Sequence, residues 1–174
     1  ASSERHRLTW LYLQSETDLF RRPIRFLHFA PEPSMQRKIA IYMTIDYTPA
    51  AFDPEKPEAG VDIQHLPYPD GSFDLIYCSH VLEHVPDDRL ALRELKRVLR
   101  SGGTAIVLVP TRNEPATYED PSITSREERE KHFGQWDHLR WYGRDFPVRV
   151  AEVGFDVSVE YYSDRFSIDD QLRF

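Results

Sequence analysis

Apolar and polar positions between residues 66 and 110 follow the order of a turn, a buried strand, a helix and a second buried strand. The strand segments are almost entirely apolar, as expected of parallel strands that are covered on both faces. The helix places Leu92, Leu95 and Leu99 at helical spacing, and Gly102-Gly103 are predicted to end it. The four parts are a turn at residues 69–72, a strand at 73–78, a helix opened by Pro86-Asp87-Asp88 and a strand at 104–109.

Similar patterns continue on both sides of this unit. Residues 4–14 carry apolar side chains at helical spacing, and residues 24–30 alternate as a strand does. Ser34 is placed to N-cap a short helix that runs from Met35 to Ile39. The remaining predicted elements are strands at 40–45, 61–63 and 155–161, and a helix at 144–153 that Gly154 ends.

This alternation of strands and helices predicts the α/β class, with a Rossmann-like, doubly wound, mostly parallel sheet and helices on both faces. We expect a single domain over residues 1–174, in which residues 1–22 form an N-terminal helical extension. Residues 111–135 are polar and too long for an ordinary connection, so we expect a lid or an insertion there. Ligands of such sheets bind at the carboxyl ends of the strands, which directs attention to those positions.

Composition narrows the class of partner. The net charge of −7 argues against a nucleic-acid backbone as the main partner, because such binding depends on Lys and Arg neutralising phosphates. Cys78 is the only cysteine, which excludes an internal disulfide or a cysteine-based zinc site and fits a cytoplasmic location. No apolar run approaches the roughly 20 residues that span a bilayer, so no membrane partner is predicted.

Two acidic residues follow predicted strands. Asp46 follows the second strand, where an acid can accept hydrogen bonds from both hydroxyls of a ribose; the alternative is a loop acid that begins a turn toward Pro49. Asp62 follows the third strand and could accept an adenine amino group while Ile63 packs on the ring. The alternative for Asp62 is a surface acid that precedes a turn.

The loop after the first strand, Ala30-Pro31-Glu32-Pro33-Ser34, replaces the usual phosphate-binding glycines. Its prolines lack amide donors and Glu32 adds negative charge, which makes a poor site for NAD or a nucleoside triphosphate. A ligand without phosphate and with a cationic end would suit the loop, and Glu32 could attract that end. Alternatively, Glu32 only caps the next helix.

Ser79 and His80 follow the buried strand at residues 73–78 and are expected to face the reactive end of a ligand. His80 and His84 lie four residues apart, a spacing that can bind a metal on a helix. We predict no metal site, because the HExxH arrangement is absent and Pro86 ends the turn at once. One histidine is expected to pack structurally and the other to border the pocket.

Rings and polar groups are dense in the segment KHFGQWDHLRWYGRDF, at residues 131–146. Such density suits a pocket that orients a substrate, and Arg140 could hold an anionic acceptor by a bidentate contact. A structural loop pinned by aromatic side chains is the alternative. The residues concerned are His132, Trp136, His138, Arg140, Trp141 and Tyr142.

Residues 70–110 resemble, nearly position for position, the middle of class I S-adenosylmethionine-dependent methyltransferases of the type 11 group. The matching parts are the strand DGSFDLIYCS, the segment HVLEHV and the following helix with its two glycines and strand. The stretches LHFAPEP (27–33) and FGQWDHLRWYGRDF (133–146) are similar to a subgroup in which HFAPE stands where others carry an acid and three glycines. The likeness extends over residues 24–162.

This resemblance implies S-adenosylmethionine as cofactor and transfer of its methyl group to an oxygen, nitrogen or carbon nucleophile, and we expect a small-molecule acceptor. It implies Asp46 at the ribose and Asp62-Ile63 at the adenine. The other residues expected beside the cofactor are His28, Phe29, Ala30, Glu32 and Ser79. Members of the family usually end in an antiparallel hairpin, which we expect to be incomplete here, with the natural protein extending beyond both ends.

A methyltransferase of this kind needs the acceptor to be positioned and, in many cases, deprotonated. His80 and His138 are the candidate bases, and Arg140, Trp141 and Tyr142 are the candidate substrate-binding residues. The alternative hypothesis is a binding module without catalysis, in which the glycine-less loop reflects a changed use of the fold.

Overall fold

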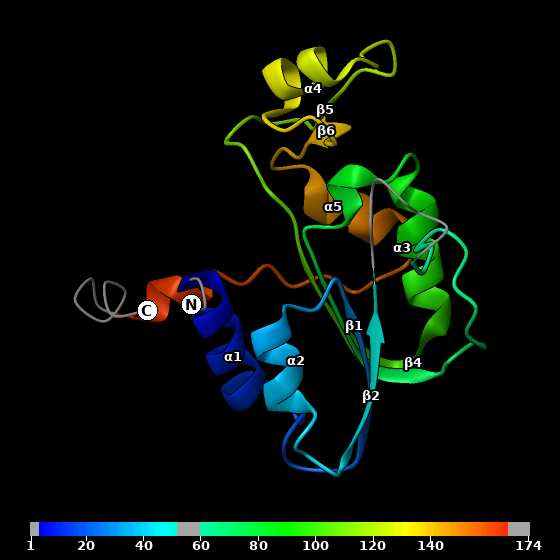
Figure 1. Ribbon diagram of the computed structural model, residues 1–174, viewed down its shortest axis with the longest axis vertical. Coiled ribbons are helices and arrows are strands. Elements are labelled where there is room, and N and C mark those ends of the chain that lie inside the picture. The colour runs from blue at the N-terminus through cyan, green and yellow to red at the C-terminus, as the bar shows by residue number, and fades with distance from the viewer. Residues whose placement is uncertain (1–3, 52–59, 167–174) are drawn as a thin grey trace.

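A four-stranded parallel sheet forms the centre of the chain, in the order β2-β1-β3-β4 (Figure 1). The structure is a computed structural model, and it describes residues 4–51 and 60–166. The strands are β1 (Ile24–Phe29), β2 (Ile45–Ala50), β3 (Phe73–Ser79) and β4 (Leu99–Leu108). The predicted Rossmann-like, mostly parallel sheet is thereby confirmed.

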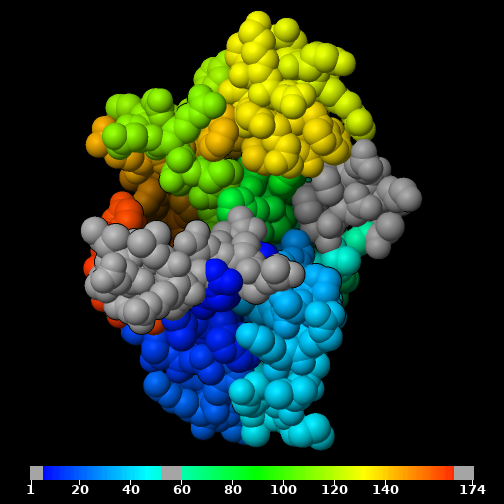
Figure 2. All heavy atoms as spheres, turned by 60° about the vertical axis from the view of Figure 1, so that its left-hand side comes forward, coloured from blue at the N-terminus to red at the C-terminus, as the bar shows by residue number. Residues whose placement is uncertain are grey.

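Helices cover both faces of this sheet. Leu13 of α1 (Glu4–Glu16) and Met35 of α2 (Pro33–Ile39) pack with Phe26 and Tyr77 on one face. Figure 2 shows these two helices side by side, in blue and cyan. The other face is covered by α3 (Asp88–Val98) and α5 (Phe146–Glu152). Two apolar cores result, one on each side of the strands, which is the arrangement of a doubly wound sheet.

The helix α3 forms where its sequence predicts. The carboxylate of Asp87 accepts a hydrogen bond from the backbone amide of Leu90 at 2.8 Å and so caps the first turn. Leu92 and Leu95 are fully buried against the sheet. The helix ends at Val98 and β4 begins in the next residue, so the chain leaves the helix before Gly102-Gly103 rather than at them.

A second, smaller unit lies beyond the carboxyl ends of the strands, toward which the β2 arrow points in Figure 1. It consists of the antiparallel pair β5 (Tyr118–Glu119) and β6 (Arg140–Trp141) with α4 (Arg126–Phe133). Gly134 ends α4 with a φ of 78°, and a Cβ there would lie 2.7 Å from the Trp141 ring. Residues 111–135, expected to be a lid or an insertion, contribute most of this unit.

Three strand predictions and one cap prediction are wrong. Ala40 caps α2 in a helical conformation and the chain turns through Tyr42, so β2 starts only at Ile45. The hydrogen bond from the His65 amide to the Asp62 carbonyl makes a turn at residues 61–65. Residues 155–161 form no strand, and no C-terminal hairpin occurs within the described chain up to residue 166. Glu32, not Ser34, is the N-cap of α2.

Two short 3-10 helices complete the described chain, η2 (Leu82–His84) and η3 (Tyr162–Arg165). The first follows β3 directly and so brings its side chains to the carboxyl edge of the sheet. No helix within residues 4–51 and 60–166 combines the length and the apolar character that crossing a membrane requires.

Candidate functional site

The chain takes an unusual conformation where two neighbouring strands end. Ala30 follows β1 with a φ of 47°, and His80 follows β3 with a φ of 56°. Left-handed backbone is uncommon for residues other than glycine, and such strain concentrates at functional sites. The amide of Ala30 donates to the carbonyl of Ala50, and that of His80 to the carbonyl of Leu108. The strained residues are therefore held by the sheet itself.

A cavity of about 480 Å³ opens beside the first of these strand ends. Its size is in the range of small-molecule sites. The residues that line it come from the ends of β1 and β2 and from α2: Ala30, Pro31, Gln36, Pro49 and Ala51. The position agrees with the rule that parallel sheets bind ligands at their carboxyl edge.

Glu32 stands next to the lining residue Pro31. The Nε2 atom of His6 lies 2.6 Å from its Oε1 atom. The other oxygen, Oε2, is buried and has no hydrogen-bond partner among the described residues. A buried carboxylate oxygen without a donor is costly, so this atom favours a ligand that brings a donor or a positive charge.

His28 and Phe29 at the end of β1 have fully buried side chains. The His28 ring stacks on Phe26 beneath α1, and its Nδ1 lies 3.1 Å from the Tyr47 hydroxyl. Burial lowers the pKa of His28 to about 4, so the ring is neutral at pH 7. Phe29 packs in the core on the opposite face. Neither side chain lines the cavity, contrary to the prediction that they lie beside the cofactor.

The prediction that Asp46 follows the second strand is wrong. Asp46 is the second residue of β2 and pairs in register with Arg25 near the start of β1. It therefore lies at the amino end of the sheet, while the cavity lies at the carboxyl end. The misplaced strand boundary is the cause, because a shift of β2 by five residues carries Asp46 from one end of the strand to the other.

Asp62 and Ile63 lie in the turn that replaces the predicted third strand. The Asp62 carboxylate accepts a hydrogen bond from the Gln64 amide at 2.8 Å and contacts His65 Nδ1 at 3.0 Å. Burial opposes ionisation of Asp62, but these hydrogen bonds outweigh it and lower its pKa. Ile63 is fully buried in the core and offers no open face for a ring, contrary to its predicted role.

Polar groups gather where β3 ends. The hydroxyl of Ser79 is buried and has no hydrogen-bond partner among the described residues. His80 is one-third exposed, and its Nδ1 lies 3.1 Å from Oε1 of the fully buried Glu83. A carboxylate at this distance holds an imidazole in a fixed orientation. The Nε2 atom of His80 is then the atom available to act as a base.

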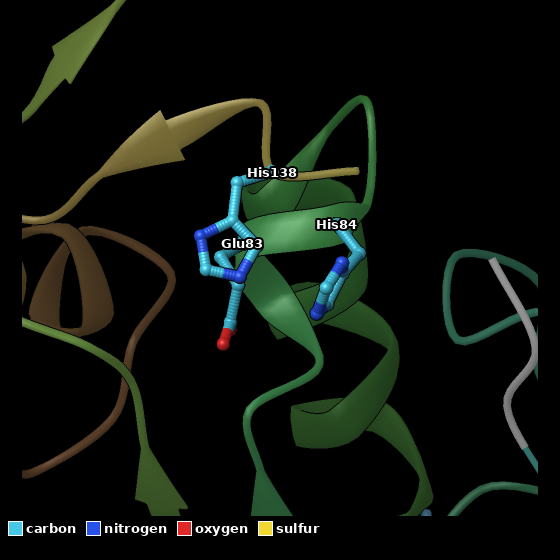
Figure 3. Close-up of side chains that lie close together, drawn as sticks. All are labelled: Glu83, His84 and His138. Atoms are coloured by element: carbon cyan, nitrogen blue, oxygen red, sulfur yellow. The ribbon is translucent and has the colours of Figure 1, made fainter. Parts of the chain in front are cut away.

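Two further histidines lie beside Glu83, as Figure 3 shows. Donor atoms of Glu83, His84 and His138 lie within 4.8 Å of one another. The two imidazole rings meet edge to face, with centroids 4.8 Å apart. His138 comes from the segment just before β6, so the fold joins residues 54 positions apart in the sequence. Burial and the neighbouring His84 lower the pKa of His138.

Arg140 and Tyr142, both predicted to bind the substrate, have polar contacts within the protein. Arg140 is 3% exposed, and its guanidinium donates to the backbone carbonyls of Leu82, Val85 and Pro86. The Tyr142 hydroxyl donates to the buried Asp88 carboxylate at 3.0 Å. The polar groups of both side chains are thus bound inside the protein, and their contact with a substrate stays a prediction.

Trp141 lines a second cavity, of about 280 Å³. The Arg112 guanidinium lies 4.3 Å from the centre of its ring, and the indole Nε1 has no hydrogen-bond partner among the described residues. The segment that was predicted to line a pocket thus contributes Trp141 and Tyr142 to a cavity wall, while Arg140 is buried.

Sequence reasoning missed Glu83, Gln36 and Pro49. Gln36 and Pro49 carry no chemical signature, so only the folded chain shows that they line the larger cavity. Glu83 could have been singled out from the sequence, because it forms the pattern His-x-x-Glu-His with His80 and His84. Its burial and its proximity to His138 depend on tertiary contacts that this spacing does not contain.

Known proteins share both the sequence and the fold of this region. The family model described as "Methyltransferase domain" matches residues 32–107. Ajmaline N-methyltransferase of Rauvolfia serpentina is 40% identical over 68 residues, which are 39% of this chain and 23% of that protein. The chain therefore matches about a quarter of the length of that curated relative.

Two solved structures show the same fold at low sequence identity. An S-adenosylmethionine-dependent methyltransferase from Mesorhizobium loti aligns with a TM-score of 0.52 and 15% identity, over 90% of this chain and 85% of that one. The [4+2]-cyclase SpnF aligns with a TM-score of 0.57 and 19% identity, over 91% of this chain and 60% of that one. The sequence of residues 32–107 is thus similar to a methyltransferase domain, and the described chain has the fold of these two solved structures.

Proposed function

We propose that this chain binds S-adenosylmethionine in the cavity between the ends of β1 and β2 and transfers its methyl group to a small-molecule acceptor. The observation that carries the proposal is the cavity of about 480 Å³ at the carboxyl edge, whose lining residue Pro31 precedes Glu32 with its buried Oε2 atom. The name of ajmaline N-methyltransferase, a small-molecule methyltransferase, supports this class of acceptor.

The residues at the cavity fit this cofactor better than a dinucleotide. Pro31 and Pro33 have no amide protons, and Glu32 brings negative charge to the position where a pyrophosphate would need bare amides. S-adenosylmethionine has no phosphate and carries an ammonium group, for which Glu32 Oε2 is a suitable acceptor. When bound, the cofactor supplies a methyl group on a positively charged sulfur, which a nucleophile can attack.

On the acceptor side, His80 is the residue placed to take a proton. Glu83 fixes its Nδ1, which leaves Nε2 for the acceptor. The ring is one-third exposed, so a substrate can reach it. Of the predicted substrate-binding set, Trp141 and Tyr142 line the second cavity, and Trp141 is the more exposed of the two. Orienting the acceptor toward the methyl group would supply much of the rate.

A matched pair of variants tests where the cofactor binds. Glu32→Gln should weaken binding of S-adenosylhomocysteine by about 1.5–3 kcal/mol, the range for a hydrogen bond that involves a charged group. Asp46→Ala should leave the affinity unchanged, because Asp46 lies at the opposite end of β2. Isothermal titration calorimetry measures both, with circular dichroism as the check on folding. Equal affinities of Glu32→Gln and the natural protein would remove Glu32 from the site.

A further inference from the structure

The cluster of Glu83, His84 and His138 at the carboxyl end of β3 has the composition of a metal site. We propose that it binds one divalent transition-metal ion, with Zn²⁺ as the ion that fits its ligands best. Two imidazoles and one carboxylate form a known set of three protein ligands for zinc, with further positions open to water or substrate.

Glu83 gives the first argument for an ion. The side chain is fully buried, and neither carboxylate oxygen has a well-aligned hydrogen bond within the described parts of the chain, although His80 Nδ1 lies 3.1 Å from Oε1. The guanidinium of Arg140 reaches the carbonyls of Leu82 and Val85 on either side of Glu83, but it donates to these carbonyls and to Glu119. Buried carboxylates are normally paired with a cation or bound to a metal, and an ion on the second oxygen would complete the pairing that His80 begins at Oε1.

The tautomers of the two histidines give an independent argument. His138 Nδ1 lies 3.2 Å from the Phe133 carbonyl, and His84 Nδ1 lies 3.3 Å from the carbonyl of Asp137. A carbonyl only accepts hydrogen bonds, so each Nδ1 carries the proton and each Nε2 carries the lone pair. Metal-binding histidines are oriented in this way, by a carbonyl or carboxylate on the other ring nitrogen. The carboxylate of Asp137, 3.3 Å from His84 Nδ1, is a further acceptor that orients this ring.

The geometry is close to what coordination needs. Ligand atoms around tetrahedral zinc lie roughly 3.3 Å apart, given metal–ligand distances of about 2.0–2.1 Å. The three donor atoms here lie within 4.8 Å of one another, so movements of about 1 Å bring them to the ion. A bound ion would tie η2 to the segment before β6 and so fix the outer unit over the strand ends.

Titration of the chelator-treated full chain with Zn²⁺ alone tests the proposal. Isothermal titration calorimetry should show one equivalent bound. Glu83→Gln, which preserves the shape of the side chain, and His138→Ala should each weaken binding at least tenfold. Asp137→Asn should weaken it about tenfold to a hundredfold, the usual effect of changing a group that orients a ligand histidine. His132→Ala is the matched control, because it removes a histidine beside another glutamate, Glu128, on α4 and should leave binding unchanged.

Thermal unfolding distinguishes a specific metal site from weak binding to surface side chains. Zn²⁺ should raise the melting temperature of the natural protein and of His132→Ala, but not that of Glu83→Gln. The absence of an equivalent site, or equal zinc affinity in Glu83→Gln and in the natural protein, would overturn the proposal. Cofactor binding to the metal-free chain is measured separately, so failure here is distinct from failure of the proposed methyltransferase function.

Discussion

Among single residues, buried polar atoms without partners mark the carboxyl edge of the sheet. Glu32, Ser79 and Glu83 each carry such an atom, and they follow or adjoin the ends of β1 and β3. A folded domain leaves few buried polar groups unpaired, and those it does leave require an explanation. Our proposals of a cofactor at Glu32 and a metal ion at Glu83 give such an explanation for two of the three atoms.

His28 shows what burial does to a titratable group away from that edge. Its pKa falls from 6.5 to about 4 on folding. Between these pH values the unfolded chain binds a proton that the folded chain does not, so stability falls as pH falls. The contribution of His28 is fully present above pH 6.5 and lost by about pH 4, and it amounts to about 3 kcal/mol at 1.36 kcal/mol per pKa unit.

Urea unfolding at pH 7 and at about pH 4 measures this loss. The natural protein should lose about 3 kcal/mol more of unfolding free energy over this range than His28→Gln, in which position 28 cannot titrate. Other titrating groups are present in both proteins and cancel in the difference. Identical pH dependence of the two proteins would mean that His28 is not buried as a neutral ring.

Among the elements, the contact between η2 and β6 holds the outer unit to the sheet. Arg140 in β6 donates to three carbonyls in and just after η2, while its Nε donates to Glu119 of β5 at 2.9 Å. A guanidinium satisfies several acceptors at once because its donors lie in a fixed plane. Arg140 therefore serves to fix the position of η2, and with it Glu83 and His84.

Arg140→Lys should accordingly reduce stability, since one ammonium cannot reach all of these carbonyls. Leaving buried acceptors unpaired costs roughly 1–3 kcal/mol each, so we expect a loss of about 2–4 kcal/mol in chemical unfolding. Arg93→Lys on the exposed face of α3 is the control and should change stability by less than about 0.5 kcal/mol. An unaltered unfolding midpoint in Arg140→Lys would contradict the anchoring role.

The boundaries of the elements also explain why some site residues could be predicted and others could not. The periodicity of α3 and the apolar runs of β3 and β4 determine their positions, so Ser79 and His80 were placed correctly at a strand end. The segment at 40–50 has no such periodicity. Ile41 and Met43 look like strand residues but are 74% and 97% exposed, and the resulting shift of β2 misplaced Asp46.

At the scale of the whole molecule, the sheet and its two helical layers follow from the alternation of apolar strands and amphipathic helices. The positions of the candidate site residues follow from this alternation only in part. The sequence shows that residues 131–146 carry aromatic and charged side chains. It does not show which of these side chains form contacts within the protein. Tyr142 and Arg140 turn inward because Asp88 and the η2 carbonyls meet them there, and these contacts join residues more than 50 positions apart.

Binding of the cofactor to the natural chain tests the central claim most directly. Calorimetric titration should show that S-adenosylhomocysteine binds and that NAD does not, because Pro31 and Pro33 lack the amides that a pyrophosphate requires and Glu32 repels it. Glu32→Gln in parallel should lower the affinity for S-adenosylhomocysteine. Tighter binding of NAD than of S-adenosylhomocysteine, or no binding of S-adenosylhomocysteine by the folded chain, would contradict the account.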